Sequence, residues 1–187
     1  MSKPTRYWIT SGVGESEISE LDAIDNAFMN SGLGYQNHIK VSSIPPVLEI
    51  TPEIDSERGI THVEIAGTKK MIPFSTNIHV VKSIITGNKN QQLTACIALA
   101  KVFVQIEEKN TSCVLAFESK GKDGNQTLSR AIDGVKSMAL RRKAKFDTSW
   151  GISGIKTVCS ELTVRKKFGC SVSFVVFDPF TYVDIKK

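Results

Sequence analysis

Several features that assign a chain to a common class are missing from this sequence. It has no Cys-x-x-Cys pair, and its three histidines stand apart from one another. Its cysteines lie in apolar stretches, which favours buried free thiols over a zinc site or a disulfide framework. The isolated histidines leave no metal-ligand cluster, so we expect no bound metal. The cysteines are Cys96, Cys113, Cys159 and Cys170.

Long apolar runs are missing as well. No stretch approaches the length of a membrane span, and the first residues lack the apolar core of a secretion signal. We therefore expect a cytoplasmic protein with no membrane partner. There is no internal repeat, low-complexity tract or linker, and 187 residues suffice for one domain with its own core. We expect a single domain over residues 1–187.

The charge balance is basic, with a net charge of +5, which raises the question of nucleic-acid binding. The basic residues are scattered, apart from clusters at 141–145, near a predicted helix end, and at 165–167, in a predicted turn. Cations near a helix C-terminus interact favourably with its dipole, so a solvated face explains the first cluster. No basic helix or aromatic platform accompanies these residues, and we expect no nucleic-acid partner.

Periodicity and turn residues predict two helices among many strands. A glycine-rich turn at 11–14 leads to a helix capped by Ser16 and ending near Asn30. A second helix covers about 125–145, because Leu128, Ala131, Ile132, Val135, Met138 and Ala139 share one face. Predicted strands are 6–10, 38–42, 59–71, 76–86, 112–118, 153–164 and 169–177, and residues 93–106 fit a strand or a buried helix. This order predicts an α/β or α+β sandwich with helices covering a sheet.

A Ser-Ser pair, Ser42-Ser43, leaves the short strand at 38–42 and is followed at once by Ile44 and two prolines. Proline stiffens the chain and prevents continued helix, so the pair is held in a tight turn. Serine pairs are common in turns, and this motif alone indicates no function.

Around this pair the sequence resembles the pyruvoyl-dependent arginine decarboxylases, over about residues 8–50 and 94–177. Each matching piece is common by itself, and the order and spacing of the pieces make the signal specific. Segment 60–93 is longer than the corresponding family region, and Phe28 and Gln36 replace smaller or aliphatic residues near the expected pocket. The pieces are Gly14-Glu15, Leu21 to Ala27, Asn30 to Gly34, Asn37, Ser42 to Ile44, Cys113 to Glu118, Thr163-Val164 and Lys167 to Cys170.

The resemblance implies a four-layer αββα sandwich of the pyruvoyl-dependent histidine/arginine decarboxylase type and a chain that cleaves itself. The Ser43 hydroxyl attacks the Ser42 carbonyl to form an ester, and elimination followed by hydrolysis leaves a pyruvoyl group at position 43. The products are a β chain of residues 1–42 and an α chain of residues 43–187. The pyruvoyl group replaces pyridoxal phosphate as electron sink, so no phosphate-binding motif is needed. The glycine pair Gly12-Val13-Gly14 is a weak match to such a motif and is typical of a turn.

Two residues have catalytic roles by this resemblance. Glu118 is the proton donor, and burial at the end of an apolar strand would help it to hold a proton near neutral pH. The alternative for Glu118 is a solvated acid at a strand end. Asn37 is expected to stabilise the oxyanion on the Ser42 carbonyl or to position the substrate. The alternative for Asn37 is a turn residue that stabilises the loop after Gly34.

Substrate contacts are expected from Asp25, Ile44 and Phe28. Helical spacing places Ile18, Leu21, Asp25 and Phe28 on one apolar stripe, where a carboxylate is costly unless it meets a cation or donors. The family places its guanidinium-binding Asp at position 25, and a guanidinium satisfies a carboxylate with paired hydrogen bonds. An internal ion pair with a Lys or Arg is the alternative.

The activity implied is the decarboxylation of L-arginine to agmatine and carbon dioxide, a lyase reaction. The family forms homotrimers with active sites between subunits, and association of trimers into hexamers is left open. The alternatives are decarboxylation of another amino acid such as histidine, an unprocessed relative that serves as a binding or structural subunit, and, last, a basic nucleic-acid-binding domain.

Overall fold

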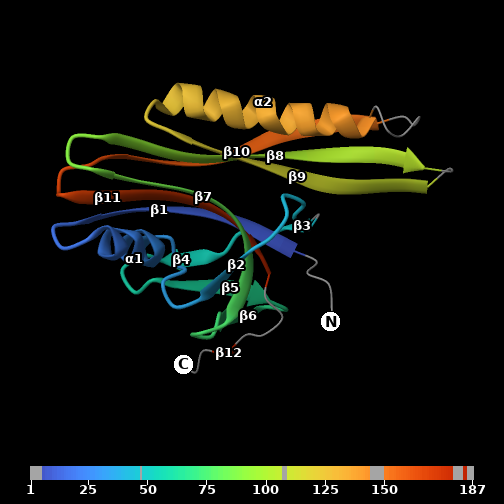
Figure 1. The fold of residues 1–187 in the computed structure, drawn as a ribbon. Coiled ribbons are helices and arrows are strands. Elements are labelled where there is room, and N and C mark those ends of the chain that lie inside the picture. The colour runs from blue at the N-terminus through green and yellow to red at the C-terminus, as the bar shows by residue number, and fades with distance from the viewer. Residues whose placement is uncertain (1–5, 47, 107–108, 144–149, 179–182, 185–187) are drawn as a thin grey trace.

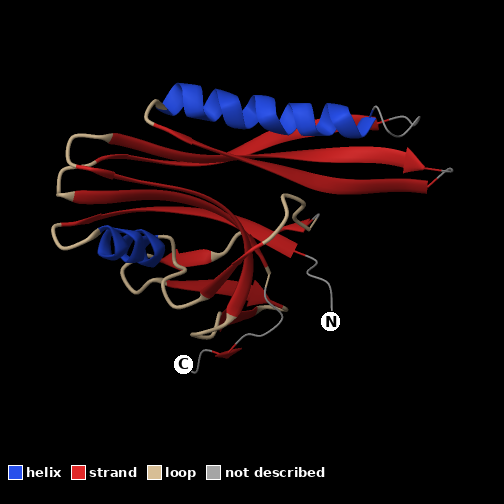
Figure 2. Ribbon diagram, in the orientation of Figure 1, coloured by secondary structure: helices blue, strands red, loops and turns tan. Residues whose placement is uncertain are grey.

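The structure is a computed structural model that describes residues 6–46, 48–106, 109–143, 150–178 and 183–184 (Figure 1). Strands dominate these ranges, with two helices among them (Figure 2). In chain order the elements are β1 Arg6–Ser16, α1 Glu20–Asn30, β2 Asn37–Lys40, β3 Leu48–Glu49, β4 Glu53–Asp55, β5 Ile60–Ile65, β6 Thr68–Met71, β7 Asn77–Asn88, β8 Gln92–Ile106, β9 Lys109–Gly121, α2 Gly124–Lys143, β10 Trp150–Thr163, β11 Phe168–Phe177 and β12 Val183–Asp184.

The elements stack in four layers, which confirms the expected α+β sandwich. A five-stranded sheet, β2-β7-β11-β1-β3, packs face to face on a three-stranded sheet, β10-β8-β9. Helix α2 covers the outer face of the three-stranded sheet, and α1 packs on the outer face of the five-stranded sheet (Figure 1). A third sheet, β12-β6-β5-β4, adds to this sandwich and was not expected.

Each interface between layers has its own apolar core. Ala131, Val135 and Ala139 of α2 are fully buried against β8 and β9, as their helical spacing predicted. Trp8 and Phe174 form part of the core under α1. The core between the sheets is lined by alternate residues of their strands, since successive side chains of a strand point to opposite faces.

The two glycines before α1 belong to a strand, so the predicted turn at 11–14 is wrong. β1 pairs with β11 without a break from Tyr7 opposite Phe177 to Ser16 opposite Phe168. A Cβ at Gly12 or Gly14 would overlap the backbone of α1, so the glycines allow the helix to lie close to the strand. Glycine is typical of both tight turns and close backbone approach, and the sequence does not separate the two.

The helix cap and two strand assignments also differ in detail. Ser19, not Ser16, caps α1, because its Oγ accepts from the Asp22 N–H at 3.1 Å. The predicted strand at 59–71 is a hairpin of β5 and β6. The ambiguous run at 93–106 is strand β8, which pairs on both sides. The last two positions of the predicted second helix, 144–145, lie outside the described residues.

The expectation of four free thiols is wrong for one pair. Cys96 and Cys159 form a disulfide, and only Cys113 and Cys170 are free. The bridged residues face each other directly across β8 and β10, although 63 residues separate them in the chain. Burial is the main reason that the pKa of the Cys170 thiol is raised to about 12.

Candidate active site

The Ser42-Ser43 turn connects the edges of the two packed sheets. Before it, the Val41 N–H donates to the Val80 carbonyl of β7 at 3.0 Å, which extends the pairing of β2. After it, the Ser43 carbonyl accepts from the Ala116 N–H of β9 at 2.9 Å. Because β9 is an edge strand, it has free backbone groups to offer this segment. The turn is therefore held from both sheets.

Within the turn, the Ile44 N–H donates to the Ser42 carbonyl at 2.8 Å. This closes a three-residue turn with Ser43 at its centre. Pro45, directly after it, is buried, whereas Ser42 is exposed and Ser43 is half-buried. The Ser42 carbonyl thus has a backbone donor, which the sequence did not indicate because any residue at position 44 except proline could supply it.

Glu118 lies two residues beyond Ala116 on the same face of β9. Its Oε2 is 3.0 Å from Nζ of Lys40, at the end of β2, and about a quarter of its side chain is exposed. The Glu118 carboxyl therefore lies near the hydrogen bond that anchors Ser43 to Ala116 (the Ser43 anchor), and it has a cationic partner, Lys40, that the sequence did not suggest. Lys40 and Glu118 are 78 positions apart in the chain, and no local sequence pattern predicts a contact over that separation.

A cavity of about 260 Å³ opens beside this ion pair. Burial, with a smaller contribution from the nearby charge of Lys40, lowers the pKa of Lys82. Three of the lining side chains are lysines and one is a carboxylate, so the cavity is cationic overall. It is lined by Lys40, Lys82, Ser83, Ile84, Glu118, Ser119 and Lys120.

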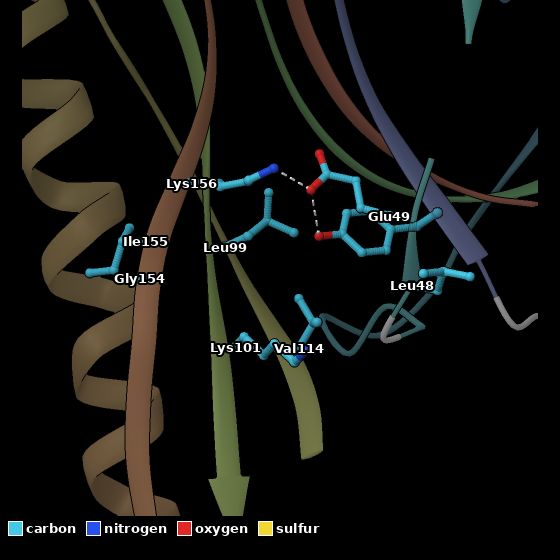
Figure 3. Close-up of a pocket in the computed structure, with 9 residues that line it drawn as sticks. Leu48, Glu49, Leu99, Lys101, Val114, Gly154, Ile155 and Lys156 are labelled. Atoms are coloured by element: carbon cyan, nitrogen blue, oxygen red, sulfur yellow. Dashed lines mark hydrogen bonds and ion pairs between the residues drawn. The ribbon is translucent and has the colours of Figure 1, made fainter. Parts of the chain in front are cut away.

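A second cavity, of about 370 Å³, lies on the other side of the Ser43 anchor along β9, since Val114 lines it (Figure 3). Glu49 joins two of its other lining residues, by an ion pair to Lys156 and a hydrogen bond from the Tyr7 hydroxyl at 3.4 Å. Burial first, and the charge of Glu49 second, raise the pKa of Tyr7 to about 12. No sequence pattern indicated that Tyr7, Glu49 and Lys156 would meet.

Asn37 is placed at the start of β2. Its Nδ2 donates to the Ser75 carbonyl at 3.2 Å, and its backbone N–H donates to the Thr76 carbonyl at 2.9 Å. These bonds fix the strand that leads to the serine pair. No hydrogen bond among the described residues joins Asn37 to Ser42, and its role towards that carbonyl stays a prediction.

The apolar stripe predicted for Asp25 is not a buried face. Asp25 is exposed, Ile18 precedes the helix, and the side chains of Ile18 and Leu21 are 81% and 75% exposed. Ala23 and Ala27 form the buried face instead. Helical spacing defines which side chains share a face, but it does not say which face meets the sheet. Among the described hydrogen bonds and ion pairs of the single chain, none joins Asp25 to Ser43 or Glu118.

Phe28 and Ile44 occupy different environments. The Phe28 ring packs on His38 and Phe174, with ring centroids 4.6 and 5.6 Å away, and Nζ of Lys82 lies 5.1 Å from its centre. Phe28 therefore reaches the cationic cavity through Lys82. The Ile44 side chain is 46% exposed beside the turn. Contact of either residue with a substrate stays a prediction.

Two plain observations complete the site. In the part of the chain that the structure describes, no group of three or more His, Cys, Asp or Glu side chains is placed to share a metal ion. Within the same ranges, no helix has both the length and the apolar character needed to cross a membrane.

Comparison with known proteins identifies relatives over almost the whole length. The model of the family "Pyruvoyl-dependent arginine decarboxylase" matches residues 6–182. A protein of that name from Methanothermobacter thermautotrophicus is 29% identical over 171 residues, covering 90% of this chain and 93% of the relative. Another, from Methanocaldococcus jannaschii, is 25% identical over 169 residues, covering 90% and 86% respectively.

Proposed function

Because the chain belongs to the pyruvoyl-dependent arginine decarboxylase family, we propose that it cleaves itself at Ser42-Ser43 and then decarboxylates L-arginine to agmatine and carbon dioxide. The observation that carries the proposal is the serine turn held on β9 two residues from Glu118. The reactive position is thereby bonded to the same strand that carries a candidate proton donor.

Cleavage begins with attack of the Ser43 Oγ on the Ser42 carbonyl carbon, which moves the acyl group from nitrogen to oxygen. The Ile44 N–H, 2.8 Å from the Ser42 oxygen, is positioned to stabilise the negative charge that develops there. Loss of the Ser43 α-proton then breaks the Cβ–O bond and releases residues 1–42 with a terminal carboxylate. Water replaces the nitrogen of the remaining dehydroalanine, ammonia leaves, and residue 43 keeps a ketone next to its own amide carbonyl.

The residues around position 43 fit such a group. Its amide carbonyl accepts from the Ala116 N–H, Pro45 two residues later is buried, and Glu118, two residues beyond Ala116 on β9, lines the cationic cavity. The pyruvoyl group supplies an electron sink for the substrate carbon that loses carbon dioxide. It is made from Ser43, so neither pyridoxal phosphate nor a metal enters the proposal.

Glu118 is proposed to protonate the substrate carbon after carbon dioxide has left. A carboxylate paired with an ammonium group must take up a proton before it can donate one. Lys40 Nζ, 3.0 Å from Glu118 Oε2, can supply that proton. The two groups then act as one proton-donating unit across the cavity.

The guanidinium end of arginine needs an anionic partner away from the cationic cavity, because the three lysines there repel it. Asp25 is proposed for this role from a neighbouring copy, in a homotrimer or in a hexamer of two trimers. The exposed Ile18 and Leu21 beside Asp25 support a face that a second copy covers. Changing Leu21→Glu would then dissociate the assembly in analytical ultracentrifugation, and an unchanged mass would contradict this face.

Intact-mass measurement tests the cleavage. We expect two chains, residues 1–42 and 43–187, with the larger one modified by hydrazines at its first residue. Ser43→Ala removes the attacking hydroxyl and should leave one unsplit chain. Ser42→Ala is the matched control and should still split, because the Ser42 side chain is exposed and takes no part in the chemistry. An unsplit wild-type chain would refute the proposal and favour a non-catalytic relative.

Carbon dioxide release from arginine, lysine, ornithine and histidine tests the substrate. Arginine is expected to be preferred. Asp25→Asn should raise the KM for arginine by about tenfold or more, because an amide cannot form the charge-assisted pair with a guanidinium. Asp22→Asn, in the same helix, is the control and should leave the KM unchanged. Preference for histidine would keep the pyruvoyl chemistry and reject the arginine assignment.

A further inference from the structure

The Ala116 N–H that donates to the Ser43 carbonyl lies at the free edge of β9. The register between β8 and β9 is unbroken from Ile106 opposite Lys109 to Thr94 opposite Gly121. Every second N–H of β9 therefore points away from β8, at the free edge of the sheet. Among the described backbone hydrogen bonds, the one donated from this outward row to another segment comes from Ala116.

We infer that the Ala116 N–H is a catalytic group of the proposed decarboxylase, acting on the amide carbonyl of residue 43. The inference rests on the proposed function. After cleavage, this carbonyl is bonded to the ketone carbon of residue 43, so electrons drawn from the substrate can spread onto its oxygen. A donor 2.9 Å from that oxygen stabilises the added negative charge and makes the neighbouring ketone more electrophilic.

Burial strengthens this effect. Ala116 has no exposed surface, and Pro45 next to the turn is buried as well. A hydrogen bond shielded from water is electrostatically stronger than an exposed one. The donor belongs to a paired strand, so it does not have to reorient as the charge develops.

The same bond also sets the distance from residue 43 to the proton donor. Ala116 and Glu118 are one pleat repeat apart, roughly 7 Å along the strand. Lys40, three residues before Ser43, contacts Glu118 from the opposite sheet. The turn is thus tied to β9 at Ala116 and at Glu118, which keeps the reacting carbon within reach of the carboxyl.

Replacing the single N–H by an oxygen tests the inference without changing a side chain. Semisynthesis can place lactic acid at position 116, which turns that amide into an ester. Glyceric acid at Ser112 is the matched control, because Ser112 lies in the same outward row and its N–H makes none of the described backbone hydrogen bonds to other segments. By the alternation of the strand, each ester also weakens one bond to β8, so the control includes this side effect.

We expect both esters to split into the same two chains, since the Ile44 N–H still serves the Ser42 carbonyl. The ester at 116 should lower kcat by about a hundredfold, the lower end of the range for losing one oxyanion donor. It should also slow the trapping of the residue-43 ketone by a hydrazine in the absence of substrate. A ¹³C label in the residue-43 amide carbonyl should shift to higher infrared frequency as its donor is lost. The ester at 112 should match the wild type in all of these.

Three results would overturn the inference. Equal kcat and equal trapping rates in the two esters would show that the donor does not act on the ketone. Loss of splitting in the 116 ester alone would assign the bond to maturation instead of turnover. An unsplit wild-type chain would remove the proposed function, and this inference with it, before either ester is compared.

Discussion

The disulfide between Cys96 and Cys159 should stabilise the fold by an amount that follows from the length of the loop it closes. Its half-cystines are 63 residues apart, so the bridge closes a long loop in the unfolded chain. The loss of chain entropy for a loop of this length corresponds to about 4 kcal/mol of stabilisation. In a domain of this size, each kcal/mol changes Tm by about 2–4 °C, so removing the bridge should lower Tm by about 8–16 °C.

The double variant Cys96→Ala and Cys159→Ala removes the bridge, and thermal unfolding followed by circular dichroism measures the result. Cys113→Ala is the control, because Cys113 is free and only half-buried. The bridge joins β8 to β10, whereas Glu118 and Ala116 lie on β9, on the other side of β8. Below the unfolding transition we therefore expect turnover to stay unchanged.

Thiol titration in denaturant gives the refuting result. Two thiols should titrate without reductant and four with it. Four thiols in the unreduced protein would show that the bridge does not form. A decrease in Tm no larger than that of Cys113→Ala would show that the bridge contributes little stability. A disulfide is uncommon in a reducing compartment, so the titration also bears on the expected cytoplasmic location.

Three further predictions concern the site and the helix beside it. Gly14→Ala should destabilise the fold by about 1–3 kcal/mol in urea unfolding, because the added methyl overlaps the backbone of α1; an unchanged midpoint would contradict this packing. Glu118→Gln should lower kcat by about a hundredfold or more while leaving the mass of the split chains unchanged, and full turnover would exclude it as proton donor. Lys82→Met should raise Tm at pH 7, because burial lowers the Lys82 pKa and charging it costs the folded state stability. That gain should shrink as the pH rises towards 10.5, the ordinary lysine value, and a gain independent of pH would refute the electrostatic cause.

Much of the fold could be predicted from local pattern. The apolar spacing of α2 predicted its buried face, and the apolar run of β11 predicted a strand. The ordered motifs around Ser42-Ser43 and Glu118 indicated the family, which the comparison then confirmed. These signals are carried by residues close together in sequence, where backbone geometry alone determines which side chains share a face.

Other features required the tertiary structure, because they depend on which distant segments meet. Gly12 and Gly14 fit a turn equally well until α1 is seen against β1. The spacing placed Leu21, Asp25 and Phe28 along one side of the helix but did not give the exposure of Asp25 to solvent.

The candidate active site separates most clearly what local sequence determines from what tertiary packing decides. The sequence by itself determined which residues are proposed to carry the chemistry, Ser43 and Glu118, because their types and order follow a motif. Only the tertiary structure decided that Lys40 pairs with Glu118 and that the Ala116 N–H meets the Ser43 carbonyl. The physical reason is that a backbone N–H is the same in almost every residue. Its role is defined by where the edge of a sheet comes to lie, and that position results from the packing of the whole sandwich.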